Sequence, residues 1–300
     1  MNIKQYIDNP KNILIGLLNK LSVLLTDSAF IKCQFYLHMG RRLNLKAPMT
    51  YNEKLNWLKI HDHNPLYTQL VDKYAVKNYV AKAIGQQHII KTLGVWDNFD
   101  DINFNTLPNS FVLKTTHGGG NTGVVICKDK TSFDFQKARE ILNKSLRTNI
   151  YSTSREWPYK NVHRRILAEE FLDNKGEDLP DYKFFCFNGE VKALFIGTER
   201  GSGDVKFDFY DADFNHLDLV QAHPMSMRNI RKPITFEKMK EIASQLSKGF
   251  PHVRIDLYEY KGNVYFGEFT FYHHGGVVPF HPEKWDYVFG SWIELPTKKN

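Results

Sequence analysis

The clearest alternation of apolar and polar positions runs from His252 to Thr270 and predicts a β-hairpin. On the first strand every second residue is apolar: Val253, Ile255 and Leu257. The returning strand supplies a matching apolar set: Tyr265, Phe269 and Phe271. Between the two sets lies Lys261-Gly262-Asn263, which is typical of a turn. One face of this hairpin should therefore be buried, and the other should carry the polar side chains.

The length of the turn decides which side chains face one another. A two-residue turn at Lys261-Gly262 would place Glu268 opposite Ile255 and bury its carboxylate among apolar side chains. Because register follows the hydrophobic pattern, we predict a three-residue loop centred on Gly262. That register creates four pairs across the ladder: Asp256 with Glu268, Arg254 with Thr270, Ile255 with Phe269, and Val253 with Phe271.

Two carboxylates that face one another, Asp256 and Glu268, destabilise a strand pair unless a positive charge lies between them. Mg²⁺ meets this need, because it is a hard cation that one or two carboxylates hold while phosphates and water complete its octahedron. Arg254, on the same face, could brace a phosphoryl group during its transfer. A solvated hairpin face with ordinary charges is the competing interpretation of this stretch alone.

Residues 1 to about 65 are predicted to form a helical segment, in which Thr50-x-x-Glu53 is a capping-box signal for a helix over Thr50–Ile60. A second helix is predicted over Leu66–Ile84, and its polar side carries Lys73 and Lys77. The simplest interpretation of those two lysines is a solvated helix face.

The remainder of the chain predicts mainly strands, and Val95–Asn109 is expected to be irregular. Two further helices are expected over Phe135–Leu146 and Phe236–Lys248. The other strands are predicted at Phe111–Lys114, Val124–Cys127, Ile166–Leu172, Asp181–Asn188, Val191–Thr198 and Phe207–Tyr210.

The stretch Thr115–Gly123 is rich in glycine and joins two of these strands. Glycine lets backbone amides converge on an anion without obstruction by side chains, so the stretch could form a flap over phosphates, with Lys114 at its base as a point charge. It matches neither a Walker loop nor a dinucleotide-binding fingerprint, because no Gly-Lys-Ser/Thr follows and no helix opens after it. A mobile hairpin tip is the competing interpretation.

The chain is basic, with 40 Lys and Arg against 33 Asp and Glu and a formal net charge of +7. This favours anionic partners such as nucleotides, acidic glycans or a membrane surface. Nucleic acid is not indicated, because no dense basic run is interleaved with aromatic residues. Tyr151–Arg165 combines aromatic and cationic residues. It could grip an acidic substrate, or it could be a surface loop whose arginine stems lie on apolar surface.

Cysteine usage and the first apolar segment bear on the compartment. Cys33, Cys127 and Cys186 are scattered and form no CxxC motif, so neither a zinc site nor a disulfide framework is indicated, and a reducing cytoplasm fits. The segment Ile13–Leu25 is too short and too polar to span a bilayer and lacks a signal-peptide cleavage site. Its spacing suits an amphipathic helix that either packs on the body of the protein or docks on the membrane surface.

Six stretches together resemble the TupA-like ATP-grasp family of bacterial cell-surface polysaccharide and teichuronopeptide biosynthesis, over roughly residues 50 to 290. They are YNEKLNWLKIHDHNPLYTQLVDKYAVKNYV, GVWDNFDDI, FVLKTTHGGG, REWPYKN, DYKFFCFNGE and VRIDLYEYKGNVYFGEFTFY. The resemblance implies an α+β ATP-grasp fold in which two α+β lobes clamp the nucleotide after a helical N-terminal segment. The expected divisions are a helical segment at residues 1–65, a small lobe with the glycine-rich flap at 66–168, and a large lobe with the metal-binding hairpin at 169–300.

By motif position, the resemblance also implies a role for each candidate residue. The ATP phosphates would be contacted by Lys73 and Lys114 and covered by the loop that contains Gly118, Gly119, Gly120 and Gly123. Adenine would be contacted by Glu169 and by the backbone of Glu170, Phe171 and Leu172. Asp181 would hold the ribose, and Lys183 would approach the γ-phosphate. Mg²⁺ would be bound by Asp256, Glu268 and Thr270, with Arg254 supporting an acylphosphate.

The sequence departs from the family pattern in two places. Many ATP-grasp enzymes place Asn two residues after the metal-binding Glu, where this chain has Thr270, and a hydroxyl ligates Mg²⁺ more weakly than an amide oxygen. The chain also has helices where other members place a Rossmann-like domain before the nucleotide lobes, which leaves the binding of the other substrates open.

Three functions are compatible with the sequence. The first is an ATP- and Mg²⁺-dependent carboxylate–amine ligase, which would add an amino acid or amine to a uronic-acid-containing polysaccharide or a lipid-linked precursor. The second is a glycosyltransferase, for which Asp211-x-Asp213 is the only candidate metal motif. The third is a non-catalytic nucleotide-binding assembly protein. A cytoplasmic location, with peripheral membrane contact through the N-terminal helix, is the expectation for the ligase.

Overall fold

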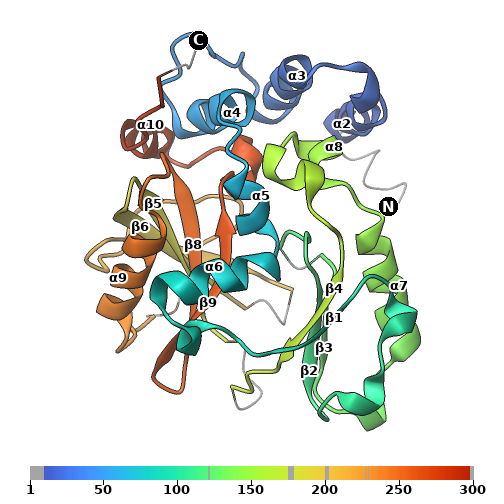
Figure 1. Cartoon of the computed structure of the whole chain (residues 1–300). Helices are drawn as coiled ribbons and strands as arrows, with labels where there is room; N and C mark the ends of the chain where they lie inside the picture. The colour runs from blue at the N-terminus through green and yellow to red at the C-terminus, as the bar shows by residue number, and fades with distance from the viewer. Residues whose placement is uncertain are drawn as a thin grey trace.

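The computed structural model describes residues 10–120, 122–174, 179–199, 203–226, 228 and 230–297, in which the chain forms two antiparallel sheets flanked by helices (Figure 1). The four-stranded sheet has the order β1 (Thr92–Trp96), β4 (Ile166–Glu170), β2 (Phe111–Thr115) and β3 (Val124–Cys127). The five-stranded sheet has the order β7 (Lys206–Asp211), β6 (Glu190–Thr198), β5 (Asp181–Phe187), β8 (Val253–Tyr260) and β9 (Asn263–Thr270). The predicted α+β class with two lobes is therefore confirmed.

Each sheet has its own apolar core. Helix α7 (Phe135–Leu146) packs on the four-stranded sheet through Ala138 and Leu142, which are buried against Phe111 and Leu113. Helix α9 (Phe236–Leu246) packs on one face of the five-stranded sheet, in a larger core that also contains residues of α5 (Leu66–Val71) and α6 (Ala75–Ile84). The predicted lobe boundaries remain predictions.

Helices at the N-terminal end lie across one end of the molecule (Figure 1). They are α2 (Pro10–Lys20), α3 (Asp27–Met39) and α4 (Tyr51–His61). The capping box at the start of α4 is confirmed, because the Thr50 hydroxyl accepts from the Glu53 backbone N–H and the Glu53 carboxylate accepts from the Thr50 N–H, both at 3.3 Å. Helix α4 packs beside α10 (Lys284–Ser291).

The prediction of a single helix over Leu66–Ile84 is wrong, because Asp72 divides this stretch into α5 and α6. Its Oδ1 accepts from the backbone N–H groups of Tyr74 at 2.8 Å and Ala75 at 3.0 Å, which starts α6 anew. An Asp side chain that bonds to nearby backbone competes with helix continuation, although the apolar spacing runs through the break. The break places Lys73 between two helices, and its N–H donates to the carbonyl of Thr116 at 2.8 Å.

Other elements differ less from the prediction. Strand β1 lies partly within the stretch expected to be irregular, and residues 150–161 contain α8 (Ile150–Ser154) and a 3-10 helix (Trp157–Asn161) where a loop was expected. Strand β4 ends at Glu170, two residues before the predicted limit. The hairpin of β5 and β6 turns at Asn188-Gly189 as predicted, with φ values of 46° and 87°. Further 3-10 helices cover Ser22–Leu24, Gln86–His88, Phe99–Asp101, Phe104–Thr106, Lys130–Ser132 and His273–Gly276.

The hairpin of β8 and β9 has the predicted register at its base but not at its tip. Asp256 pairs with Glu268, whereas Tyr260 pairs with Asn263, so the turn contains only two residues. Lys261 and Gly262 both have positive φ, 50° and 76°, as a tight hairpin turn requires. The prediction of a three-residue loop centred on Gly262 is therefore wrong.

A β-bulge reconciles the short turn with the register of the acids. The register shifts by one residue between the pairs Asp256–Glu268 and Leu257–Phe266, so Gly267 is the extra residue. As a result Val264 and Phe266 face the core, while Tyr265, which the simple alternation placed inside, is only half-buried. The ladder begins at Arg254 and Thr270, one residue short of the predicted Val253–Phe271 pair.

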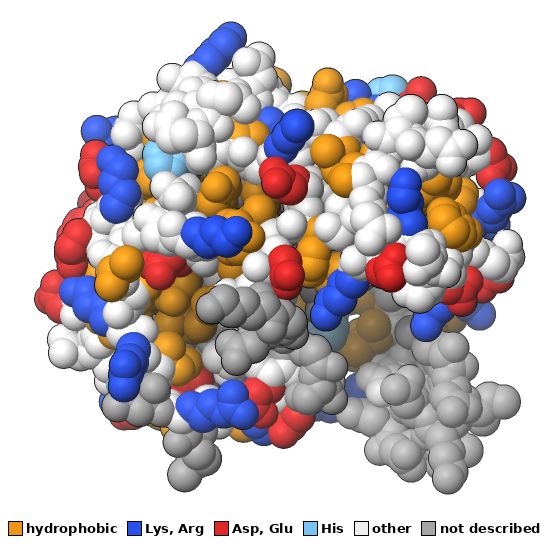
Figure 2. All heavy atoms as spheres, turned by 90° about the horizontal axis from the view of Figure 1, so that it is seen from below, with side chains coloured by type: hydrophobic (Ala, Val, Ile, Leu, Met, Phe, Trp, Pro, Cys, Tyr) orange, Lys and Arg blue, Asp and Glu red, His pale blue; other side chains and the backbone are white. Residues whose placement is uncertain are grey.

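The surface opposite the N-terminal helices carries acidic and basic side chains side by side, with apolar groups between them (Figure 2). In the described ranges, no helix combines the length and the apolar character that crossing a bilayer requires.

Candidate active site

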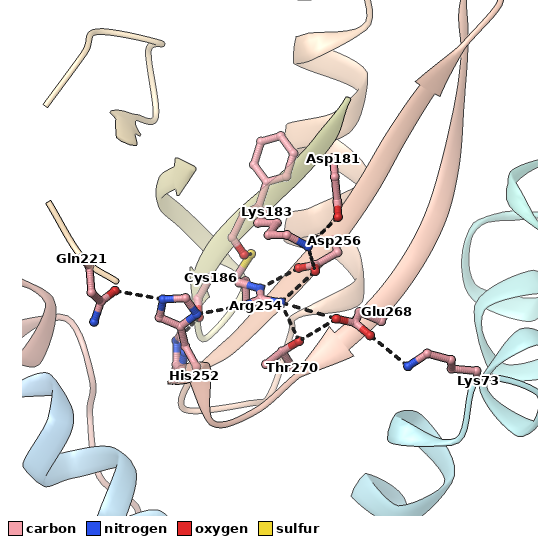
Figure 3. Close-up of polar contacts among 12 residues, drawn as sticks. Lys73, Asp181, Lys183, Cys186, Gln221, His252, Arg254, Asp256, Glu268 and Thr270 are labelled. Carbon is pink, nitrogen blue, oxygen red and sulfur yellow. Dashed lines mark hydrogen bonds and ion pairs between the residues drawn. The ribbon is translucent and has the colours of Figure 1, made fainter. Parts of the chain in front are cut away.

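The two facing carboxylates lie on the face of the five-stranded sheet that points away from α9. Alternation along β8 places Val253, Ile255 and Leu257 on the face covered by α9, and Asp256 on the opposite face. The bulge keeps Glu268 on that same face, so the two acids lie side by side as predicted (Figure 3). Asp256 is almost fully buried, and the side chain of Glu268 is 27% exposed.

Arg254 binds both partners of this pair. Its Nε and Nη2 donate to the two oxygens of Asp256 at 2.7 Å and 2.8 Å, and Nη2 also donates to the Thr270 hydroxyl at 3.0 Å. Glu268 lies 3.5 Å from the same Nη2. Burial alone would lower the pKa of Arg254, but the neighbouring carboxylates, Asp256 first, raise it above its ordinary value. The guanidinium is therefore a fixed positive charge at the centre of the site.

Lys183 reaches the same carboxylates from the neighbouring strand β5. Its Nζ forms ion pairs with Asp181 at 2.7 Å and with Asp256 (Figure 3). Burial opposes its charge, but Asp181 and Asp256 raise the pKa of the lysine. Burial raises the pKa of Asp256 against the pull of Arg254 and Lys183. Asp181 is thus a partner of Lys183, and its predicted contact with ribose remains a prediction.

Lys73 connects the acids to the glycine-rich loop. Its Nζ lies 2.5 Å from the carbonyl of Gly118 and 3.1 Å from Oε2 of Glu268. Burial alone would raise the pKa of Glu268, but Lys73, Lys183 and Arg254 lower it to about 2. The helix break at Asp72 is what aims this lysine into the site, and Asp72 is itself held by Arg165 at 3.1 Å.

The glycine-rich loop has little room for side chains at Gly118 and Gly123. A Cβ on Gly118 would lie 2.5 Å from the Thr122 carbonyl, and one on Gly123 would lie 2.3 Å from the Ser145 hydroxyl. Gly120 and Gly123 have positive φ. Gly119 is open, and Asn121 lies outside the described residues. Glycine is therefore required here by close approach and by backbone conformation, as a loop near phosphates would need.

A charged hollow is lined by Lys73, Lys77, Ile89, Ile90, Lys114, Glu169, Phe266 and Gly267, and it shares Lys73 with the group around Glu268. Glu169 forms ion pairs of 2.5 Å with both Lys77 and Lys114. Burial alone would raise the pKa of Glu169, but Lys114 and Lys77 lower it below its ordinary value. Lys114 and Glu169, predicted to contact the ATP phosphates and adenine, are thus paired with one another here, and those roles remain predictions.

Lys77 is a site residue that the sequence interpretation missed. Its side chain is only 14% exposed, and its Nζ donates to the Ile90 carbonyl at 2.7 Å and the Thr92 hydroxyl at 3.0 Å. Lys73 is similarly buried, with 13% of its side chain exposed, so the interpretation of both lysines as a solvated helix face is wrong. The four-residue spacing suggests a shared helical face, but Lys73 lies in the break before α6, so the spacing was no reliable signal for Lys77.

The last three candidates for adenine contact lie at the edge of this region. Glu170 is exposed, and its N–H donates to the Lys91 carbonyl at 3.0 Å. Phe171 and Leu172 follow the end of β4 and are half-buried. Their contact with a nucleotide remains a prediction.

His273 is a second residue without a role in the sequence interpretation. Its Nδ1 lies 2.7 Å from Nη1 of Arg254, and its Nε2 lies 2.9 Å from Oε1 of Gln221. Because arginine only donates hydrogen bonds, Nδ1 of His273 must accept one. The ring therefore carries its proton on Nε2, which donates a hydrogen bond to Oε1 of Gln221. Burial lowers the pKa of His273 far below its ordinary value, which keeps the ring neutral. The only sequence signal was its position just after the hairpin.

The donor set at Asp256, Glu268 and Thr270 fits Mg²⁺ shared with a nucleotide. The three side chains offer carboxylate and hydroxyl oxygens, the ligands that this ion prefers. Within the described ranges, no cluster of three His, Cys, Asp or Glu side chains could hold a metal by itself. Phosphates and water would have to complete the coordination, as is usual for nucleotide-bound Mg²⁺.

Comparison with known proteins bears on this arrangement. The family described as "TupA-like ATPgrasp" matches residues 53–294. The chain belongs to this TupA-like ATP-grasp family. None of the curated proteins compared with the chain matches it.

Solved structures of ligases are similar to the chain at low sequence identity. D-alanine–D-alanine ligase from Bacillus anthracis shares 16% identity at a TM-score of 0.39, over 67% of this chain and 57% of that protein. The same ligase from Helicobacter pylori shares 18% at 0.39, over 81% and 69%. The ATP-grasp ligase PsnB, complexed with a minimal precursor, Mg and ADP, shares 10% at 0.37, over 73% and 57%. The chain therefore spans little more than half the length of two of these three proteins.

Proposed function

We propose that this TupA-like ATP-grasp protein is an ATP- and Mg²⁺-dependent carboxylate–amine ligase. One observation carries the proposal: Lys73 contacts both the glycine-rich loop, at Gly118, and the acid Glu268. A lid for phosphates and a metal-binding carboxylate would therefore share one lysine. Phosphoryl transfer depends mainly on positioning and charge neutralisation, which this group of side chains can supply.

In the proposed first step, a substrate carboxylate oxygen attacks the γ-phosphorus of ATP, and the bond to the β-phosphate oxygen breaks. Lys183 and Lys73 would exchange their carboxylate partners for phosphate oxygens, and Arg254 would neutralise charge on the transferring group. Mg²⁺, held by Asp256, Glu268 and Thr270, would offset the phosphate charge.

In the proposed second step, the amine nitrogen attacks the acyl carbon, phosphate leaves, and the nitrogen loses a proton as the amide forms. Arg254 is again the group placed to accept negative charge, because His273 and Asp256 fix its orientation. The loop at Gly118–Gly123 would limit entry of water, which would otherwise hydrolyse the acylphosphate.

We further propose that the carboxylate belongs to a uronic acid of a cell-envelope polysaccharide or its lipid-linked precursor, and that the amine is an amino acid or a related amine. The net charge of +7 supports an acidic glycan as partner. A cytoplasmic location fits a protein that consumes ATP.

The glycosyltransferase alternative has little structural support. Asp211 accepts hydrogen bonds from the backbone of Asp213 at 2.9 Å and Asn215 at 2.8 Å, and from the Asn215 side chain at 2.9 Å. The first acid of the Asp-x-Asp motif is therefore occupied in stabilising a turn.

The test is an ADP-release screen over amino acids and uronic-acid glycans, separately and in pairs. The ligase proposal expects release that needs both a carboxylate and an amine. Turnover of a UDP-sugar without ATP would support the glycosyltransferase instead, and ATP binding without turnover on any pair would support an assembly protein.

A further inference from the structure

The segment from α2 to the end of the 3-10 turn after it exposes six large apolar side chains to solvent. Val23 and Leu24 are 86% and 77% exposed, and the other members expose about half of their surface. We name this surface the N-terminal apolar face; it consists of Ile13, Leu14, Leu17, Leu21, Val23 and Leu24. Exposed apolar side chains that form one contiguous patch usually mark a contact site, unlike scattered single ones.

The arrangement is the reverse of that of a helix packed by its apolar stripe. Successive helical residues are about 100° apart, so Ile13, Leu14 and Leu17 fall within one arc of about 100°. Leu18, outside that arc, is 8% exposed, and α2 lies against α3. The side of α2 that contains Leu18 therefore packs on the protein, and the arc that contains Ile13, Leu14 and Leu17 faces solvent.

This segment is fixed to the body of the protein. Arg155 donates from Nη2 to the carbonyl of Ser22, and its guanidinium lies 4.6 Å from the ring centre of Phe30. Asp27, at the start of α3, pairs with Arg155 at 3.3 Å and accepts from the Tyr151 hydroxyl at 2.7 Å. The apolar face is thus presented on an anchored platform.

The charge around the face has one dominant sign. Residues 11–49 contain six Lys and Arg, of which Arg41 is paired with Glu53 and Asp286, and one acidic residue, Asp27, which is engaged by Arg155 and Tyr151. Lys11 and Lys20 lie on α2 itself, and both are exposed. The opposite face of the protein, in contrast, mixes both signs (Figure 2).

We propose that the N-terminal apolar face lies on a membrane that contains anionic lipids. The apolar side chains would enter the boundary between headgroups and acyl chains, and the flanking lysines would contact lipid phosphates. A second copy of this segment is a poorer occupant, because two basic surfaces would repel one another. This proposal stands independently of the ligase reaction.

Co-sedimentation of the full chain with vesicles tests the proposal. We expect binding to vesicles of phosphatidylglycerol and phosphatidylcholine, weaker binding to phosphatidylcholine alone, and release by salt. Replacing Leu14, Val23 and Leu24 together with Asp should lower the partition coefficient at least about ten-fold. Lys20→Glu should reduce the preference for the anionic vesicles.

The matched control is Ile234→Asp, because Ile234 is 88% exposed but belongs to another part of the chain. Circular dichroism and the thermal midpoint would verify that all variants fold. Absence of vesicle binding, unchanged binding of the triple variant, or equal loss in Ile234→Asp would overturn the proposal. So would a concentration-dependent dimer that the triple variant abolishes while vesicle binding persists.

Discussion

Lys73 and Glu268, 195 positions apart in the chain, lie 3.1 Å from one another across the candidate active site. The same ammonium lies 2.5 Å from the Gly118 carbonyl. Lysine and arginine side chains therefore provide the positive charge that the acids need. Binding of Mg²⁺ and ATP would require these cations to change partners.

We predict that Lys73→Met lowers ATP affinity and reduces stability at neutral pH by about 1–2 kcal/mol, because Glu268 loses its nearest cation. The pKa of Glu268 is lowered from 4.5 to about 2, so the stabilisation is full above pH 4.5 and is lost as pH falls toward 2. The difference between variant and wild type in urea unfolding should therefore shrink on acidification. Lys82→Met, an exposed change on α6, is the control. A constant difference across pH would contradict the assignment.

We predict that Asp256→Asn and Glu268→Gln each lower turnover about 10²–10³-fold, because each removes a carboxylate oxygen from the metal site. Steady-state ADP release at saturating ATP measures the effect. Asp213→Asn, which alters the rival acidic motif, should leave turnover unchanged. Full activity in either of the first two variants would exclude the proposed metal site.

We predict that Thr270→Val raises the Mg²⁺ concentration needed for half-maximal activity about ten-fold, whereas Thr270→Ser does not. The hydroxyl now accepts from Arg254 at 3.0 Å, and valine has the same shape without it. A titration of activity with Mg²⁺ distinguishes the two. If valine and serine behaved alike, the hydroxyl would have no role in metal binding.

We predict that stability falls as pH drops below 6.5, partly through His252. The ring is buried, accepts from the Tyr51 hydroxyl at 2.9 Å and donates to the Cys186 carbonyl at 3.1 Å. Burial lowers its pKa from 6.5 to about 3, so the unfolded chain binds a proton in this range that the folded chain does not. The slope from this group should approach about 1.4 kcal/mol per pH unit. His252→Gln should flatten it, while His163→Gln, at an exposed position, should not.

We predict that Gly267→Ala impairs both stability and activity. A Cβ there would lie 3.0 Å from the Asp256 carbonyl and from the Tyr258 ring, so the bulge must shift, at about 1–3 kcal/mol. Gly262→Ala provides the contrast, because its positive φ of 76° strains the turn in open space, away from the acids. Comparable loss of activity in both variants at equal stability would argue against the bulge as the element that aligns the acids.

The hydrophobic pattern predicted the pairing at the base of the hairpin, because burial of Ile255 and Phe269 fixes which face Asp256 occupies. It did not predict the tip. A bulge adds one residue without any change in composition, so the alternation of two strands cannot reveal it. The tight turn depends on backbone conformation at Lys261, which also has no signature in apolar spacing.

The charged contacts were harder to predict than the strands. Lys73 and Lys77 lie in a stretch whose apolar residues have the regular spacing of one helix. The break that redirects Lys73 depends on the hydrogen bonds that one side chain, Asp72, accepts from the backbone. Lys183 and Asp256 meet because β5 pairs with β8, an order that no local pattern contains. Family resemblance, rather than spacing, placed these residues in one site.

The extra residue at Gly267 compensates for the short turn, so that Asp256 and Glu268 remain paired. A chain with a three-residue turn could pair the two acids without the bulge, because the residue added at the tip would take over the role of Gly267 in the register. Turn length and bulge should therefore vary together among relatives, and an insertion at the tip would be harmless when a deletion at Gly267 accompanies it.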